Sequence, residues 1–535
     1  MQQAAVFAWQ EFIALSWPAV KQTGAINTRD TADSNCKFGD PNCTGPLVWQ
    51  TFRGKVEIFP GKGNPPGYPS VGPGDQWYGY DAPTSYVYSA NVKPCDTPAP
   101  LGTPWINLDE TDQITLDSMF AGIAPTQATG NSSPQMIRFL AKANRTEYVY
   151  VAKNKWWAQI DPTVRANTQK FLTTNMRSPD PDSSQYVSLP NGAIEAKAGW
   201  RPLTQKESNS GRFTTTTVRY YENENNPCYR QATMGLVALH LIQKTPTAPY
   251  FIYATFEQAD NIETASGNPV ENEDGGIIPP LPGCGPGQTA PCTTPSVTLQ
   301  DTATVTPPMG GGLPPQVNPV PASAQFCTPS VSTTPPNQLY YLNSFKQPAL
   351  PDKGFICINY RDNAIPQPII DANHTAHAAI RAYNQAQGIP DSPWLYYKLV
   401  NVQYQPIDKN YAGVYTGNDQ NSGHNASSYH QANIVVETNR PLQLFSGGLL
   451  GTGANSDYDS QFNKGATGIH KNMYYGGSQF NMGGCMGCHG SQGQHAIGDF
   501  SVILARGKVH FPEVPAPLTN SGAGVVRRNR SLVWK

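Results

Sequence analysis

Four segments of the chain decide its fold: GAIEAKAGWRPL (192–203), GRFTTTTVRYYE (211–222), MGLVALHLIQKT (234–245) and YFIYATFEQAD (250–260). Each segment is rich in β-branched and aromatic residues, which favour extended strands. Polar or proline-containing stretches such as NENNP and KTPTAP separate them, and such stretches are typical of turns. Four strands this close together predict an antiparallel sheet or part of a β-sandwich.

Helices are expected before and after these strands in the sequence. The apolar stretch at about 5–16 predicts an amphipathic helix, and ANHTAHAAIRAYNQAQG (372–388) predicts a second one. We also expect helices over PQMIRFLAKAN (134–144) and over about 162–175. Further strands are expected elsewhere, namely at LVWQTFRGKVEIF (47–59), YVYV (148–151) and KLVNVQYQP (398–406).

Proline and glycine are frequent, with 50 and 48 residues, so regular elements must be short and loops long. Their density is highest at 264–338, where we expect neither a helix nor a central strand. We therefore divide the chain into an N-terminal mixed lobe with the antiparallel sheet (1–263), an extended insertion (264–338) and a C-terminal lobe (339–535). The prediction is a β-rich α+β fold with several lobes and a haem segment near its C-terminus.

The charge pattern excludes some classes of function. Formal net charge is -1 and only 14% of residues are charged, so no nucleic-acid partner is expected. No run of about 18 apolar residues occurs, so no transmembrane segment is expected. The apolar stretch 4–20 contains Glu11 and Pro18 and lacks a basic start, so it is not read as a signal peptide. If the protein is exported, we expect its signal peptide to be missing from this sequence.

Eight of the ten cysteines lie outside the motif described next, and most have polar, Pro/Gly/Asn-rich surroundings. An even number in such loops predicts disulfides, with free buried thiols as the alternative. The close pairs Cys36/Cys43 and Cys284/Cys292 are the expected bridges. The eight are Cys36, Cys43, Cys95, Cys228, Cys284, Cys292, Cys327 and Cys357.

One short motif carries chemistry, and it reads Cys485-Met486-Gly487-Cys488-His489. On a helical turn, positions i, i+3 and i+4 share one face. Two thiols placed there can add to the two vinyl groups at one edge of a porphyrin, while the histidine reaches the iron. The motif therefore predicts one covalent haem c, with His489 as the proximal ligand.

Two other interpretations of the motif remain open. The pair Cys485 and Cys488 also fits zinc, which needs a second ligand pair such as the HTAH of 374–377. The same spacing fits a redox-active dithiol or a disulfide.

The stretch CMGCHGSQGQHAIGDFSVIL (485–504) resembles the haem segment of large single-haem c-type cytochromes of the bacterial cell envelope. AWQEFIALSWPA, IEAKAGWRPL and LVALHLIQKT followed by YATFEQADN fit the same resemblance, which covers most of the chain. The resemblance implies a haem cofactor and a periplasmic or secreted location. It implies no particular substrate.

The second axial position of the iron decides between electron transfer and small-molecule activation. His470 and Met473 are the nearest upstream candidates, and no methionine follows His489. His240 lies in a predicted strand, where a hydrogen-bonded core histidine is the usual outcome. Arg506 could pair with a haem propionate. Further candidates are His374, His377, His424, His430, His495 and His510.

The expected function is redox chemistry at one covalent haem, either as an electron carrier with a redox partner protein or as a peroxidase- or oxygenase-type enzyme with a small-molecule substrate. The alternative is a non-redox envelope protein whose C-terminus is held by haem or zinc. Two acidic stretches, ENEDGG (271–276) and SDYDSQ (456–461), loosely suggest calcium loops, with solvated turns as the alternative.

Overall fold

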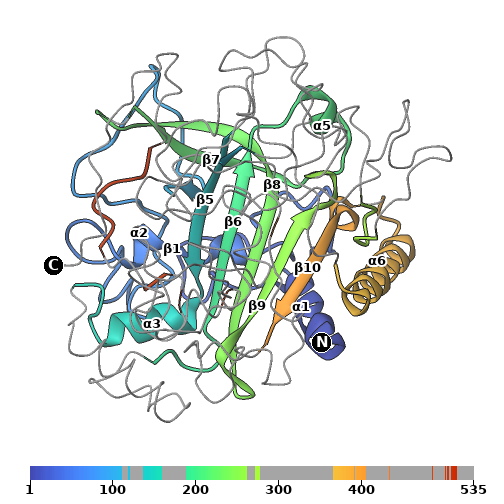
Figure 1. The fold of residues 1–535 in the computed structure, drawn as a ribbon. Coiled ribbons are helices and arrows are strands. Elements are labelled where there is room, and N and C mark those ends of the chain that lie inside the picture. Colours follow the sequence, from blue (N-terminus) through green and yellow to red (C-terminus); the bar gives the residue numbers. More distant parts are fainter. Residues whose placement is uncertain are drawn as a thin grey trace, which may run out of the picture.

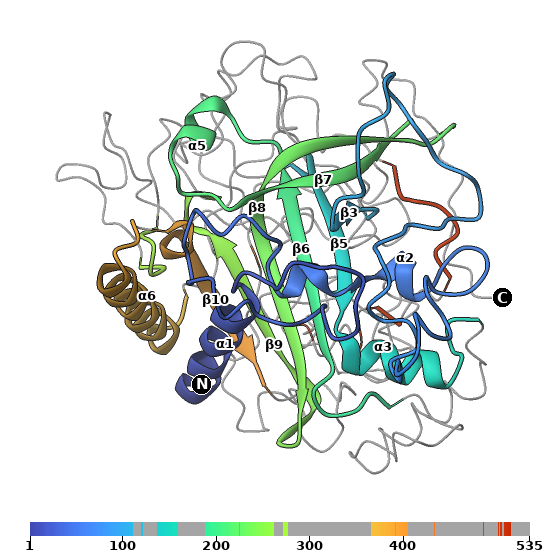
Figure 2. The same cartoon turned by 180° about the vertical axis from the view of Figure 1, so that it is seen from behind.

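The computed structural model describes the following residues: 1–110, 119–120, 136–158, 188–223, 225–261, 271–276, 365–390, 392–404, 433, 485, 501, 503–504 and 508–514. Within these ranges a ten-stranded sheet forms the centre of the molecule (Figures 1 and 2). Its strands run in the order β1-β5-β6-β8-β7-β3, with β9 and β10 added beside β8. This arrangement is a mixed, β-rich α+β fold with short helices.

All four strands predicted between 192 and 260 are present. They are β6 (Ile194–Arg201), β7 (Thr215–Glu222), β8 (Cys228–Thr245) and β9 (Ala248–Gln258). The long strand β8 organises the sheet, because β6 pairs along one of its edges while β7 and then β9 pair along the other. These ladders are antiparallel, as expected.

The remaining strands extend this core. β10 (Tyr397–Gln403), expected from the sequence, pairs with β9 across the long stretch that separates them in the chain. β1 (Arg53–Gly54) pairs with β5 (Met136–Ala143), and β5 also pairs with β4 (Met119–Phe120). Two short strands join in parallel: β2 (Lys93–Pro94) beside β8, and β3 (Ile106–Leu108) beside β7. The sheet therefore combines segments from both predicted terminal lobes.

The prediction of a helix at 134–144 was wrong, because residues 136–143 form β5. Both faces of β5 are buried: Leu140 packs into one hydrophobic cluster, and Ala141 and Ala143 pack into another. Lys142 is also buried, and its ammonium group donates to the carbonyl oxygens of Gln50 and Trp105 at 2.5 and 2.8 Å. Tertiary packing on two sides has overridden local helix propensity.

The extended structure expected for 148–151 was wrong as well, because these residues lie in α3 (Arg145–Lys153). The backbone N–H of Glu147 donates to the side chain of Asn144, which caps the helix. Asparagine at the N-cap is among the strongest helix-start signals. This signal was present in the sequence and outweighs the β-branched character of YVYV.

The strand expected at 47–59 exists only at Arg53–Gly54. It is preceded by η1 (Trp49–Thr51) and followed by α2 (Lys55–Ile58). Glu57 explains the change, because its carboxylate accepts from the backbone N–H of Gly54 at 2.9 Å and starts a helical turn. The short helices α5 (Gln205–Asn209), η2 (Ala259–Asn261) and η3 (Pro393–Tyr396) complete the described elements.

The two longer helices agree with the prediction. α1 (Gln2–Leu15) and α6 (Gln367–Gln387) pack against each other and against β10, and Figure 2 shows α1 lying over β9 and β10. They cover the hydrophobic cluster on one face of the sheet, which includes Phe256, Leu399 and Trp394. None of the described helices is both long enough and apolar enough to cross a membrane.

Glu11 is an exception on the buried side of α1. It is 7% exposed, and neither carboxylate oxygen has a hydrogen-bond partner. Burial raises the pKa of Glu11 to about 8. The folded state therefore holds a proton that the unfolded chain releases near pH 4.5, so ionisation destabilises the fold as pH rises toward 8.

We expect Glu11→Gln to remove this loss, which amounts to roughly 1.4 kcal/mol per unit of pKa shift as an upper limit. The measurement is urea unfolding of wild type and variant between pH 5 and pH 8.5. Glu222→Gln, at a side chain that is 40% exposed, is the control. Parallel pH curves for wild type and Glu11→Gln would contradict the assignment.

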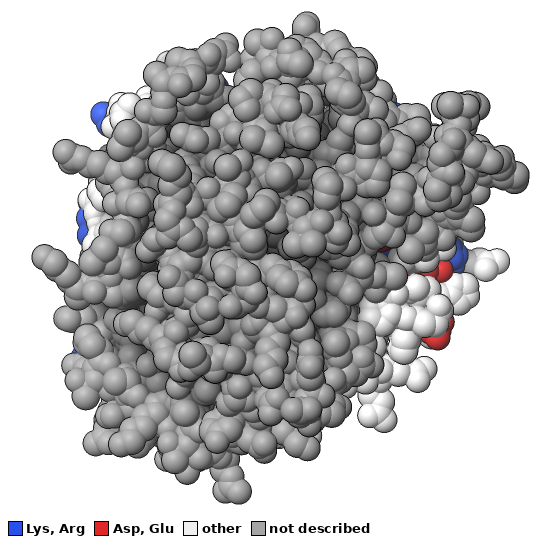
Figure 3. All heavy atoms as spheres, in the orientation of Figure 1, with Lys and Arg blue, Asp and Glu red and all other residues white. Residues whose placement is uncertain are grey.

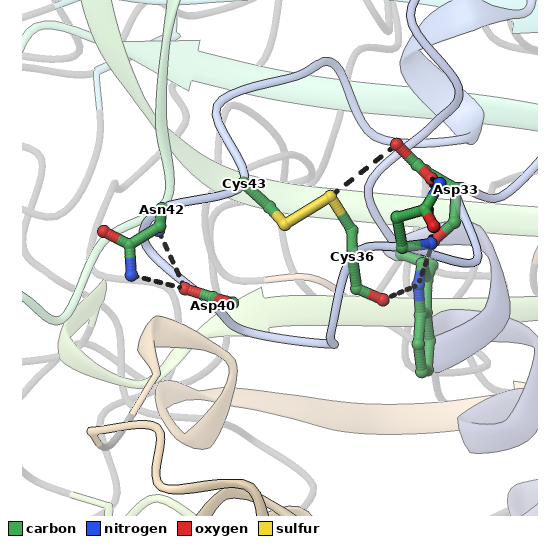
Figure 4. The surroundings of a disulfide bond; sticks show 7 residues. Asp33, Cys36, Asp40, Asn42 and Cys43 are labelled. Atoms are coloured by element: carbon green, nitrogen blue, oxygen red, sulfur yellow. Dashed lines mark hydrogen bonds between the residues drawn. A yellow bond between two sulfur atoms is a disulfide. The ribbon is translucent and has the colours of Figure 1, made fainter.

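Two disulfides lie in the described part of the chain. Cys36–Cys43 was predicted, and it closes a loop in which Asp40 accepts hydrogen bonds from Asn42 (Figure 4). The pairing of Cys95 with Cys228 was not predicted from the sequence. This disulfide joins the region of β2 to the start of β8, and its cysteines are 133 positions apart in the chain. The predicted pair Cys284/Cys292 lies outside the described residues.

Removing Cys95–Cys228 should destabilise the protein more than removing Cys36–Cys43, because the unfolded chain gains more freedom when a longer loop is opened. We expect the Cys95→Ala/Cys228→Ala variant to lose roughly 2 to 5 kcal/mol of unfolding free energy. Urea unfolding of the two double variants side by side is the measurement. A less stable Cys36→Ala/Cys43→Ala protein would argue against this ranking.

Candidate functional site

The second face of the sheet carries polar side chains at its centre. The register places Lys197 of β6, His240 of β8 and Thr255 of β9 in one row across the strands. Their strand neighbours Leu239 and Leu241 belong to the hydrophobic cluster beneath α1 and α6, so the polar row faces the opposite side. A row of this kind is a candidate for binding or redox chemistry.

His240 is held in place within this row. Its Nδ1 lies 2.5 Å from the hydroxyl oxygen of Thr255. Burial, and after it the positive charge of Lys197, lowers the pKa of His240 to about 3. The imidazole is therefore neutral at physiological pH, which is the state that a metal ligand needs.

The last described segments of the chain lie on this same face. The hydroxyl of Ser501 donates to the carboxylate of Glu195 on β6, and it accepts from the backbone N–H groups of Ile503 and Leu504 at 3.1 and 3.0 Å. Further along, the backbone N–H of Val509 donates to the carbonyl of Phe59 at 2.8 Å. Ser501 is thus fixed to the sheet, and Val509 to the end of α2.

Cys485, the first thiol of the motif, is half-buried against a hydrophobic cluster on this side. The cluster is rich in aromatic rings: Phe59, Tyr80, Tyr88, Tyr148, Tyr150, Trp156, Trp157, Tyr221, Phe251 and Tyr253. Ile503 and Leu504 belong to the same cluster. A thiol at the edge of an apolar, aromatic wall fits the attachment of a flat, largely apolar ring, so the one described residue of the motif is compatible with haem.

A buried ionic network lies beside this aromatic cluster. The carboxylate of Glu57 is 3.3 Å from the guanidinium of Arg29 and 3.5 Å from that of Arg53, and all three side chains are fully buried. Burial alone would raise the pKa of Glu57, but the two guanidinium charges outweigh it and hold this pKa below its ordinary value. Both arginines also donate to backbone carbonyls of the N-terminal loops, at Thr51, Ala82 and Tyr80.

A second part of the network joins α3 to the same loops. Arg145 makes two hydrogen bonds to the carboxylate of Asp81, at 2.6 and 2.8 Å. The phenol of Tyr80 donates to Asp30 at 2.6 Å, and burial raises the pKa of Asp30 to about 6. Because the loops between 20 and 90 contain little regular structure, these ionic contacts take over the positioning that backbone ladders provide elsewhere.

Most of the predicted site residues lie outside the described part of the chain. Cys488, His489, Arg506, His470 and Met473 are all in this group, as are His424, His430 and His495. Of the other histidines, His510 contacts Ser89 at 2.8 Å, and His374 and His377 both contact Asp274. The structure therefore brings Cys485 and His240 to the same side of the sheet and leaves the axial ligation of the iron as a prediction.

The acidic stretch 271–276, considered as a calcium loop, has its carboxylates paired with basic side chains. Glu271 contacts Lys398 at 2.6 Å, and Glu273 lies 3.3 Å from Arg212. No group of three or more histidine, cysteine or acidic side chains suited to a metal occurs among the described residues. The second acidic stretch, 456–461, lies outside them.

Sequence reasoning missed the buried network of Arg29, Arg53 and Glu57. Its residues are far apart in the chain and have no motif, so no sequence signal marks them. Comparison with family models, with curated proteins and with solved structures gave no match.

Proposed function

We propose that this chain is an exported c-type haem protein that performs redox chemistry through one covalently bound haem. The observation that carries the proposal is the pentapeptide from Cys485 to His489, whose two thiols and imidazole have the spacing of a haem c attachment site. The proposal covers two versions, an electron carrier and a haem oxidoreductase.

The surroundings of Cys485 support this reading. A zinc site needs a second pair of ligands. The HTAH pair considered for that role, His374 and His377, instead contacts Asp274 beside α6. Cys485 itself lies against an aromatic cluster, which suits a porphyrin better than a hydrated metal ion.

Chain connectivity limits where the ring can be. His489 follows Cys485 by four residues, a stretch that spans at most about 14 Å. Cys485 and Ile503 both contact the aromatic cluster, and Ser501 is bonded to β6. We therefore expect the haem to lie along the polar side of the sheet, beside this cluster.

Each of these residues would then have a separate role in binding the haem. Cys485 and Cys488 would hold the ring through two thioether bonds, His489 would supply a nitrogen ligand to the iron, and Arg506 would pair with a propionate. Haem bound in this way supplies a one-electron redox centre. The aromatic cluster excludes water from one edge of the site, and a drier site shifts the balance between the two charge states of the iron.

The proposed location is the periplasm or the exterior of the cell. Two disulfides among the described residues support it, because such bonds persist in oxidising compartments. Attachment of haem c through two thioethers and formation of disulfides are compatible with the same compartment.

The test is expression of the chain, fused to an export signal, in a bacterium that matures c-type cytochromes. We expect the denatured protein to carry the mass of one haem and to keep its visible absorption after acid-acetone extraction. A polypeptide without added mass, or one with zinc between the thiols, refutes the proposal. A low-spin spectrum unmoved by cyanide supports the carrier; a high-spin ferric spectrum shifted by cyanide supports the enzyme.

A further inference from the structure

The short acidic segment 271–276 is attached to the rest of the protein through its three acidic side chains. Glu271 pairs with Lys398 of β10, Glu273 with Arg212, and Asp274 with two histidines of α6. Figure 3 shows acidic and basic side chains on the surface at the edge of the molecule where α6 is found. The hydrogen bonds between Asp274 and the two histidines of α6 depend on which ring nitrogens carry a proton.

His377 is completely buried, and both of its ring nitrogens face oxygen atoms. Nδ1 lies 2.6 Å from Oδ1 of Asp274, and Nε2 lies 2.8 Å from the backbone carbonyl oxygen of Tyr397. The ring of Trp9 packs edge-on against it at 5.3 Å. A carbonyl oxygen only accepts, and so does an ionised carboxylate, so both hydrogen bonds form only when His377 carries a proton on each nitrogen.

Asp274 is in the ionised state that this geometry requires. Burial by itself would raise its pKa, but hydrogen bonds from His377 and then His374 outweigh burial and hold the pKa of Asp274 below its ordinary value. His374 approaches the second carboxylate oxygen at 3.0 Å and is 71% exposed. The side-chain amide of Asn373 also donates to the backbone carbonyl of Asp274 at 2.8 Å.

We propose that Asp274, His374 and His377 form a pH-sensitive clasp, which holds segment 271–276 on α6 while His377 is doubly protonated. When the ring loses one proton, one of its two oxygen partners loses its donor, and a hydrogen bond that fixes the buried ring is lost. Because the doubly protonated ring is the acidic form of an imidazole, the clasp is closed on the acidic side and loosens once His377 gives up one proton.

The other ionisable groups around the clasp are these. β10 contributes Lys398, which also lies 3.7 Å from Glu257 of β9, and Arg212 stacks on Tyr396 of η3. α1 contributes Glu11, the one ionisable side chain of that helix. Since Glu11 also changes charge near pH 8, the experiment is repeated in the Glu11→Gln background. At the acidic end the clasp fails when Asp274 takes up a proton, below about pH 4.

Hydrogen exchange measured by mass spectrometry tests the clasp, with rates corrected for the intrinsic effect of pH. In the wild-type chain we expect backbone amides of 271–276 to be at least about tenfold more protected at pH 6 than at pH 9, the factor that corresponds to 1.4 kcal/mol. Asp274→Asn should remove this difference. His374→Gln, at the exposed partner, is the matched control and should keep most of it.

A second measurement, made on the wild-type chain, tests the proposal even if a variant misfolds. Nitrogen-15 labelling of histidine in the wild-type chain reports the protonation of each ring. We expect the ring of His377 to carry a proton on both nitrogens at pH 6, and Asp274→Asn should abolish this signal pattern. Equal protection of 271–276 at both pH values, or a singly protonated His377 at pH 6, overturns the proposal. Neither readout depends on haem.

Discussion

A chain that carries Cys485→Ala and Cys488→Ala should contain no covalently bound haem after export from a bacterium that matures c-type cytochromes. Both thioether bonds of the proposed attachment come from these two sulfur atoms, so no residual linkage can form without them. The loss is expected to be complete, because there is no third cysteine in the stretch 485–535. The measurement is the intact mass of the denatured protein together with its visible absorption.

A matched control is available in the same molecule. Cys36→Ala/Cys43→Ala also removes two cysteines, but these form a disulfide in an N-terminal loop. This variant should keep a full complement of covalent haem. If the Cys485→Ala/Cys488→Ala protein retained the haem mass, or if both double variants lost it equally, the attachment site would have to be sought elsewhere.

Glu57→Gln should cost about 3 to 5 kcal/mol of unfolding free energy, the usual effect of removing one partner of a buried ion pair. The substitution keeps the size of the side chain but removes the charge that compensates Arg29 and Arg53, both of which are fully buried. Urea unfolding with comparison of midpoints and slopes is the measurement. An equal slope with a lower midpoint indicates lost stability rather than a changed unfolded state.

The exposed pair Arg230–Glu222 provides the control for this experiment. Its side chains are 38% and 40% exposed, so Glu222→Gln should change stability by less than about 1 kcal/mol. The pH dependence has a definite sign. Because the pKa of Glu57 is lowered in the folded state, its contribution is present above about pH 4.5 and is lost as pH falls further. Equal effects of the two substitutions would contradict this role of Glu57.

The main strands were predictable because β-branched and aromatic residues between turn-forming stretches leave a local pattern. Segments 192–203 to 250–260 show β-branched and aromatic enrichment between turns, and all four became β6 to β9. The helices α1 and α6 were predictable because one side of each helix is apolar. The errors fell on 47–59, 134–144 and 148–151, where the buried carboxylate of Glu57, two-sided burial and the N-cap Asn144 respectively decide the structure.

The candidate site, like the fold, could be predicted from the sequence only in part. The spacing of Cys485, Cys488 and His489 is local, so covalent haem chemistry could be inferred without coordinates, and it remains a prediction. The polar row with His240 could not be inferred, because strand register decides which residues become neighbours. The hydrogen bond between the side chains of Ser501 and Glu195, which are 306 positions apart in the chain, likewise forms only on folding.

Sequence alone determined the central strands, the two long helices and the disulfide Cys36–Cys43, and it supplied the motif from which haem attachment is proposed, because each depends on residues that are close together in the chain. Only the tertiary structure decided that Cys95 pairs with Cys228, that Glu57 neutralises two buried arginines and that Asp274 meets His377. These contacts join residues whose separation in sequence leaves no local pattern. They exist because burial makes an unpaired charge or polar group too costly to leave alone.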